Sequence, residues 1–220
     1  MSEDYDDLLS VLAEARRSVG DSRLIWCVSA DNFETTVSHR RGLILGGAWS
    51  PRFLRDRTAF GWDVPWTVYL YAPSILIIDK AVAPFAEWIP LMEAQAQARE
   101  SLLLVTREVS TELLRTFIVN YLKETLACCV IRYDESLHGW GVPAPNGPWE
   151  YRGSPPSQAD LLPRAAEGWV RRTSTVLFPS AESQWQSVTT DIAVISVGGE
   201  NHEDQQDRLR FLMKEIQEPV

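Results

Sequence analysis

Three short apolar runs, separated by two segments with helical periodicity, constrain the fold more than any other feature of the chain. The runs cover residues 75–78, 102–105 and 127–131. Each is continuously hydrophobic rather than alternating, which is the pattern of a strand that is covered on both faces. Neighbouring parallel strands need long crossover connections, which helices supply with right-handed chirality. The sequence therefore predicts an α/β fold around a parallel sheet.

The two connecting segments carry more apolar surface than a helix needs for packing on a sheet, which is a stripe of somewhat more than about 100°. The apolar side chains are Phe85, Trp88, Ile89, Leu91 and Met92 in segment 82–98, and Leu113, Leu114, Phe117, Ile118, Val119, Tyr121 and Leu122 in segment 111–125. Each helix could bury one edge of this surface and present the other to a ligand. A third layer of the same protein would explain the excess equally well.

A proline lies in the middle of the first predicted helix. Inside a helix, Pro90 would remove one hydrogen bond and cost about 3 kcal/mol unless a kink absorbed it.

The charge of the chain excludes two classes of partner. The 220 residues have a formal net charge of −9, with 30 acidic and 21 basic residues. Binding to nucleic acid or to an anionic membrane depends on a basic surface, so neither is expected. No apolar run approaches the roughly 20 residues of a membrane span. The first residues are acidic, unlike those of a signal peptide, so a cytoplasmic location is expected.

The cysteines and histidines do not form a recognisable site. The chain has three of each, at Cys27, Cys128, Cys129, His39, His138 and His202. An odd cysteine count with an adjacent pair inside a strand does not make a disulfide framework, and the adjacent pair is expected in the core. No spacing is typical of zinc ligands, so no metal is expected.

The two ends of the chain carry further elements. A helix is predicted over 5–19, with Gly20 ending it, and strands over 24–28 and 35–45. A glycine-containing turn follows over 46–53. Near the C-terminus, strands are predicted over 169–178 and 191–197 and a helix over 203–217, with Leu209, Leu212, Met213 and Ile216 on its inner face. The two ends are expected to meet in a small second domain.

Several of these segments resemble group I (GroEL-type) bacterial chaperonins. Residues 79–94 resemble the first groove helix of the apical domain, including its mid-helix proline, and 102–120 resemble the following strand and second groove helix at identical spacing. Residues 47–53 are similar to the family's glycine-aromatic-x-Ser-Pro-aromatic-Phe turn, although Ala48 and Arg52 replace its aromatics. Residues 13–20 and 191–199 resemble intermediate-domain segments.

The resemblance implies a domain organisation and a site. Residues 46–190 would form an apical-domain-like (swivelling β/α/β) lobe, with a divergent insertion rich in proline, glycine and tryptophan over 132–160. Residues 1–45 and 191–220 would form a small α/β base like the intermediate domain. Carried over by position, the apolar polypeptide-binding groove would comprise Phe53, Ile89, Met92, Leu114, Ile118, Val119 and Asn120.

The family's nucleotide-binding equatorial domain has no counterpart in the sequence. No glycine-rich phosphate loop replaces it, and Phe211 or Lys214 stands where the family has its hydrolytic aspartate. The resemblance therefore implies a protein with no cofactor that is not an enzyme.

The first hypothesis is an ATP-independent, chaperonin-like protein that binds non-native or apolar polypeptide segments. A co-chaperonin-like loop or a complete chaperonin is a further candidate partner. The alternative is an interaction or scaffold protein whose groove is occupied by its own insertion, around Trp140 and Trp149, by a second copy or by one dedicated partner.

An enzyme that uses the strand-end residues Asp79, Lys80 and Glu108 is a third hypothesis. It is disfavoured because isolated charges of this kind are more often solvated or salt-bridged. The oligomeric state is left open.

Overall fold

The chain folds into two compact units. The computed structural model describes residues 5–54, 67–78, 85–133, 156–157, 161, 164–172, 174–180 and 189–217. The terminal unit joins Met1–Arg41 with Thr190–Val220, and the central unit joins Gly42–Leu54 with Val68–Thr189. The first boundary lies inside strand β2 (Thr36–Gly46) rather than after residue 45, because this long strand contributes to both units.

The terminal unit contains α1 (Asp6–Val19), η2 (Ser22–Leu24), β1 (Ile25–Ser29), β9 (Thr190–Val197) and α4 (His202–Gln217) together with the first part of β2. β1 and β9 are parallel neighbours. Gly20 ends α1 at a φ of 72°, a left-handed conformation that glycine adopts without strain. The helices predicted over 5–19 and 203–217 and the strands predicted over 24–28, 35–45 and 191–197 are confirmed to within a residue or two.

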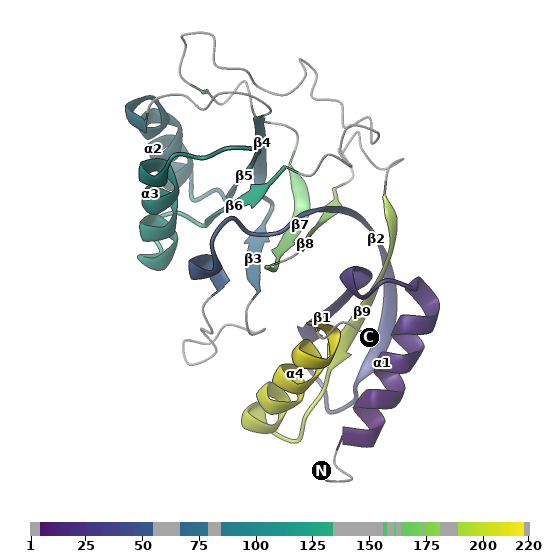
Figure 1. Ribbon diagram of the computed structural model, residues 1–220. Coiled ribbons are helices and arrows are strands. Elements are labelled where there is room, and N and C mark those ends of the chain that lie inside the picture. Colours follow the sequence, from purple (N-terminus) through teal and green to yellow (C-terminus); the bar gives the residue numbers. More distant parts are fainter. Residues whose placement is uncertain are drawn as a thin grey trace. The chain divides into compact units, whose positions relative to one another are not determined.

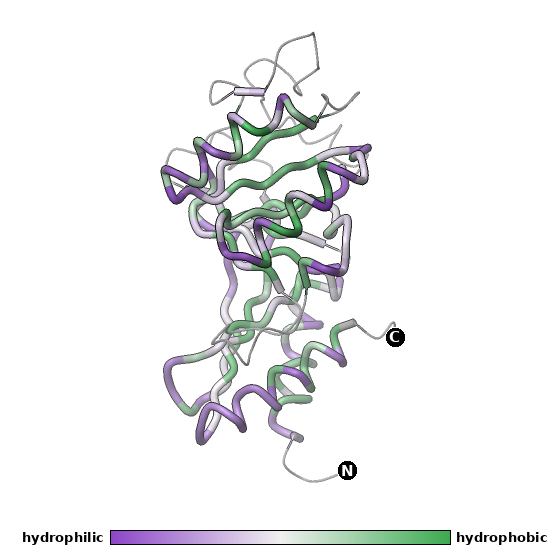
Figure 2. The backbone as a smooth tube through the Cα atoms, turned by 90° about the vertical axis from the view of Figure 1, so that its left-hand side faces the viewer, coloured by the Kyte–Doolittle hydropathy of each residue, from purple (hydrophilic) through white to green (hydrophobic). Residues whose placement is uncertain are grey.

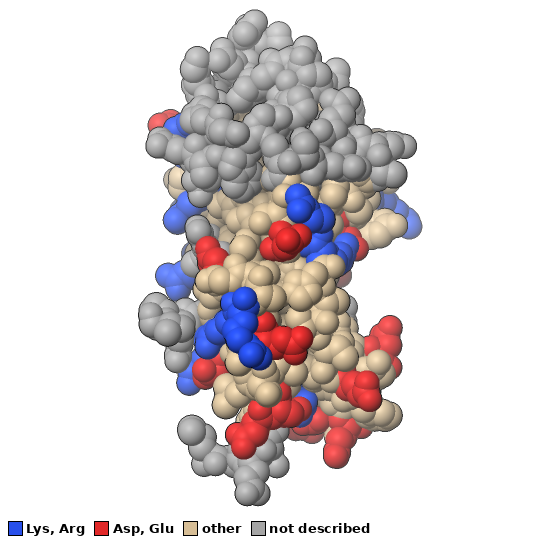
Figure 3. Space-filling view, turned by 90° about the vertical axis from the view of Figure 1, so that its right-hand side faces the viewer, with Lys and Arg blue, Asp and Glu red and all other residues tan. Residues whose placement is uncertain are grey.

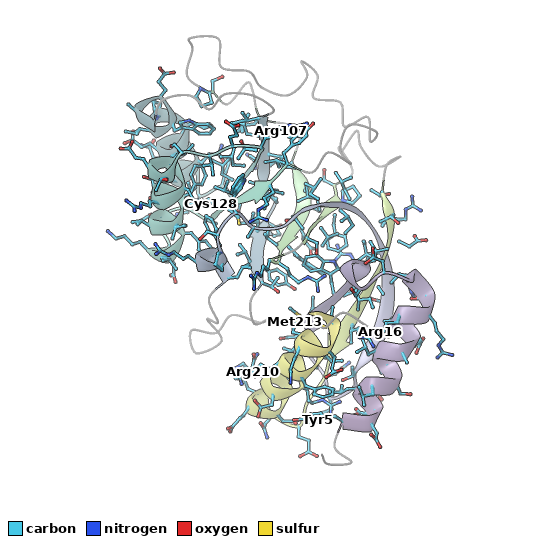
Figure 4. The ribbon with its side chains drawn as sticks, in the orientation of Figure 1. Tyr5, Arg16, Arg107, Cys128, Arg210 and Met213 are labelled. Atoms are coloured by element: carbon cyan, nitrogen blue, oxygen red, sulfur yellow. The ribbon has the colours of Figure 1, made fainter. Side chains whose placement is uncertain are left out.

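Helices α1 and α4 pack together in this unit (Figures 1 and 4). The ring of Tyr5 stacks on Phe211, with 4.7 Å between ring centroids, and the Arg16 guanidinium donates a hydrogen bond of 2.8 Å to the Glu215 carbonyl oxygen. The predicted inner face of α4 is confirmed, since Leu209, Leu212, Met213 and Ile216 are all buried.

The central unit is built on the predicted parallel sheet. Strands β4 (Ser74–Ile78), β5 (Leu102–Thr106) and β6 (Cys128–Arg132) lie in the order β4-β5-β6, and every residue of β5 is buried. Segment η5 (Phe85–Trp88) with α2 (Ile89–Ala98), and then α3 (Thr111–Leu122), make the two crossovers. Figure 2 shows the hydrophobic character of these strands, which agrees with a sheet covered on both faces.

An antiparallel sheet completes the central unit. It has the order β2-β8-β7-β3, with β3 (Val68–Tyr71), β7 (Ala165–Val170) and β8 (Ser174–Pro179). The single strand predicted over 169–178 is wrong, because the chain turns back there and the Arg171 N–H donates to the Ser174 carbonyl at 2.8 Å. The polar break at Arg171 and Arg172 was too short for periodicity to separate the two strands.

The predicted mid-helix position of Pro90 is also wrong. A 3₁₀ turn, η5, precedes α2, and Pro90 is then in the first turn of the α-helix. The N–H groups of a first turn have no intrahelical partner, so the missing donor costs nothing there. The first residues of the predicted helix, 82–84, lie outside the described residues.

The segment after β2 is attached to the edge of the parallel sheet. The Arg132 N–H donates to the Gly47 carbonyl and the Trp49 N–H donates to the Val130 carbonyl, each at 2.9 Å. The helical turn η3 (Pro51–Leu54) follows. A Cβ atom on Gly46 would overlap the Arg132 carbonyl oxygen, so this close approach requires glycine.

Gly46→Ala should destabilise the central unit, because the new methyl group meets backbone that cannot move aside. We expect a loss of about 1–3 kcal/mol in the free energy of unfolding, measured in urea. Gly20→Ala is the control, since a Cβ there meets open space and only the left-handed backbone is disfavoured. Equal stability of Gly46→Ala and the wild type would contradict the close approach.

The cysteine thiols should be unreactive in the folded protein. Cys27, Cys128 and Cys129 are free and buried, and burial raises the pKa of both the Cys128 and Cys129 thiols. The reactive form is the thiolate, so an aromatic disulfide reagent at pH 8 should label none of them until denaturant is added. Labelling of the native chain at the rate of a free thiol would refute this expectation.

Candidate polypeptide-binding surface

Helices α2 and α3 lie side by side on one face of the parallel sheet (Figures 1 and 2). Both connect neighbouring strands in the order β4-β5-β6, so crossovers of the same hand place them on the same side. Both helices therefore run in the same direction, opposite to the strands. This pair contains most of the residues predicted to bind polypeptide.

Local polar contacts fix both ends of α3. The hydroxyl oxygen of Ser110 accepts a hydrogen bond of 3.2 Å from the Leu113 N–H, which caps the helix N-terminus. At the other end, the Asn120 amide donates to the Thr116 carbonyl at 2.9 Å, and the Thr125 hydroxyl donates to the Asn120 side-chain oxygen at 2.7 Å. The predicted site residue Asn120 thus already serves to end the helix.

Two aromatic contacts hold the buried face of α3. Phe117 meets Trp88, the residue before α2, edge-to-face with 6.3 Å between ring centroids. Tyr121 meets Phe53 of η3 in the same manner at 5.7 Å. Trp88, Phe117 and Phe53 have no exposed surface. The buried face of the helix is therefore held by contacts to the residue before α2 and to η3.

The predicted groove residues of α3 do not share one side of the helix. Successive residues of an α-helix are about 100° apart, so Ile118 and Asn120, which are two positions apart, lie on opposite sides. Leu114 lies one turn before Ile118 and shares its side. The side chains assigned to one groove therefore do not all face the same space.

Only some of the predicted groove side chains are exposed. Phe53, Met92 and Ile118 are buried, with exposures of 0, 6 and 5%, so these three predicted groove residues belong to the core. Leu114 and Asn120 are half-buried. Ile89 and Val119 remain exposed, at 38 and 47%.

The exposed face of these two helices is here called the α2–α3 surface. It presents two large apolar side chains, Ile89 of α2 and Val119 of α3. Arg115 and Lys123 lie one helical turn before and after Val119, and both are exposed. Neither forms an ion pair with another described residue. Sequence reasoning missed these two cations, although their spacing of four residues from Val119 would have revealed them.

Of the three strand-end residues considered for an enzyme, Glu108 alone lies within the described residues. Asp79 and Lys80 lie outside the described residues, as do Trp140 and Trp149. Glu108 is exposed, and its backbone carbonyl accepts a hydrogen bond of 2.6 Å from the Thr106 hydroxyl.

Among the described residues, no three His, Cys, Asp or Glu side chains gather as metal ligands would. No helix in that part of the chain combines the length and apolar character needed to cross a membrane.

The two neighbouring residues Ile118 and Val119 should respond differently to truncation. Ile118→Ala removes buried methyl groups and should cost about 2–5 kcal/mol of unfolding free energy. Val119→Ala changes an exposed side chain and should alter it by no more than about 0.5 kcal/mol. Urea unfolding of both variants measures the difference, and equal losses would contradict the orientation of α3.

No model of a known protein family matches this chain. The interpretation of the α2–α3 surface accordingly rests on the residues themselves.

Proposed function

We propose that the protein binds apolar segments of other polypeptides on the α2–α3 surface, without nucleotide. One observation supports this above the rest. Among the described residues five large hydrophobic side chains are exposed, and two of them, Ile89 and Val119, belong to these adjacent helices. Both positions are among those to which the chaperonin resemblance assigns polypeptide binding. The proposal includes an apical-domain-like fold for the central unit.

Apolar burial provides affinity without demanding one sequence. Covering exposed hydrophobic surface is worth roughly 25 cal/mol per Å² and has no directional requirement. A bound segment could lie on the helices as an amphipathic helix. The aromatic contacts of Phe117 and Tyr121 already hold α3 in place, so binding need not order it.

The size of the surface favours few partners over many. Because Phe53, Met92 and Ile118 are used in the core, the remaining apolar area is smaller than the groove that the sequence predicted. This observation favours a second candidate function, an interaction protein with one dedicated partner and no general chaperone activity. The insertion and a second copy of the chain are further candidate occupants.

Charge placed at the centre of the surface should abolish binding. Val119→Glu and Ile89→Glu should each lose suppression of client aggregation in nucleotide-free buffer, because a carboxylate would have to be buried against the client. Both side chains face water, so the unfolding midpoint should change little. Leu9→Glu is the matched control, since Leu9 is 43% exposed on a helix of the terminal unit and should keep full activity.

Two outcomes would contradict the proposal. One is a pair of glutamate variants as active as the wild type. The other is suppression that appears only when ATP is added. The second candidate function would be established by two results together. The wild-type protein would protect no client from aggregation, and it would bind one partner that Val119→Glu no longer binds.

A further inference from the structure

A further exposed hydrophobic residue lies in the terminal unit, far in sequence from α2 and α3. Phe33 is 74% exposed and belongs to the loop 30–35, which joins β1 to β2. A phenylalanine buries a large apolar area when covered and is costly to leave in water. Its position on a loop, with no role in the core of this unit, makes it a candidate for contact with a partner.

The loop that presents Phe33 is held by hydrogen bonds at both ends. The Ala30 N–H donates to the Val197 carbonyl at 2.9 Å, and the Gln205 amide of α4 donates to the Ala30 carbonyl at 2.7 Å. At the other end, the Gly198 N–H donates to the Thr35 hydroxyl at 3.1 Å. The aromatic ring is thus carried on ordered backbone.

Close packing beneath the loop strengthens this order. A Cβ atom on Gly198 would overlap the backbone carbon and oxygen of Phe33, so the loop lies directly against this glycine. Within the loop, the Glu34 N–H donates to the Asn32 side-chain oxygen at 3.2 Å, which forms a local turn. A partner that contacts Phe33 would therefore lose little free energy in ordering the loop.

The surroundings of Phe33 are acidic. Asp31 and Glu34 flank it in sequence and are exposed, and Glu200 and Glu203 follow Gly198 on the adjoining segment. None of these four carboxylates forms an ion pair within the described part of the chain. Arg208 reaches the loop at Thr35, but its guanidinium is also paired with Asp7. Figure 3 shows acidic side chains gathered over this unit.

We propose that the loop 30–35 is a docking site for a cationic amphipathic segment of another protein. An apolar side chain of that segment would cover Phe33, and its lysines or arginines would approach Asp31 and Glu34. Aromatic residues at the centre of a contact commonly dominate its energy, while surrounding charges set specificity and association rate. A second copy of the chain is a poor occupant, because two acidic surfaces repel each other.

The test uses three helical peptides of equal length. One carries lysine and leucine on opposite faces, one has each leucine replaced by serine, and one has each lysine replaced by glutamate. In titrations of isotope-labelled protein, the lysine–leucine peptide should shift the amide resonances of residues 30–35 and 198–205. Phe33→Ser should weaken this binding at least about tenfold. Leu9→Ser, which changes another exposed apolar residue of the same unit, should not.

Three results would overturn the inference. The serine peptide binding as tightly as the leucine peptide would show attraction to net charge alone. Unchanged affinity in Phe33→Ser, or resonance shifts confined to α2 and α3, would exclude the loop as the site.

Two further variants are controls. Phe33→Leu, which keeps an apolar side chain, should retain most of the binding. Val119→Glu should leave peptide binding at the loop intact. The outcome of the peptide test therefore does not depend on whether the proposed function is correct.

Discussion

The position of α3 depends on two edge-to-face aromatic contacts, Phe117 with Trp88 and Tyr121 with Phe53. Phe117 and Tyr121 lie on the buried face of the helix, which Leu113 shares. Because this face is occupied, only the outer side of α3 is free to meet another molecule. The constraint that stabilises the helix layer thus also determines how much apolar surface is left for binding.

The two surfaces proposed for interaction share one physical principle. Val119 lies on a helix whose ends are closed by Ser110 and Asn120, and Phe33 lies on a loop held against Gly198. In both cases an exposed apolar side chain projects from backbone that is ordered before any partner arrives. They differ in their charges. Arg115 and Lys123 are near Val119, whereas carboxylates surround Phe33, so the two surfaces suit different partners.

Some structural features could be read directly from local sequence. The central strands were predictable because a strand covered on both faces is continuously apolar, as at 102–105. Gly20 marked the end of α1 for an equally local reason. The hairpin between β7 and β8 was missed because both strands are apolar and the turn at Arg171 is short. Pro90 was placed wrongly because periodicity does not distinguish a 3₁₀ turn from the start of an α-helix.

The amino-acid sequence by itself determined which helices carry surplus apolar surface, since hydrophobic periodicity depends only on the order of residues. It could not determine which of those residues face water. That was decided by the tertiary structure, because η3 comes from a distant part of the chain and packs against the buried face of α3. Ile118 is buried and Val119 is exposed, although they are adjacent and equally hydrophobic in character. The difference arises from what packs against each side of the helix, which no local pattern records.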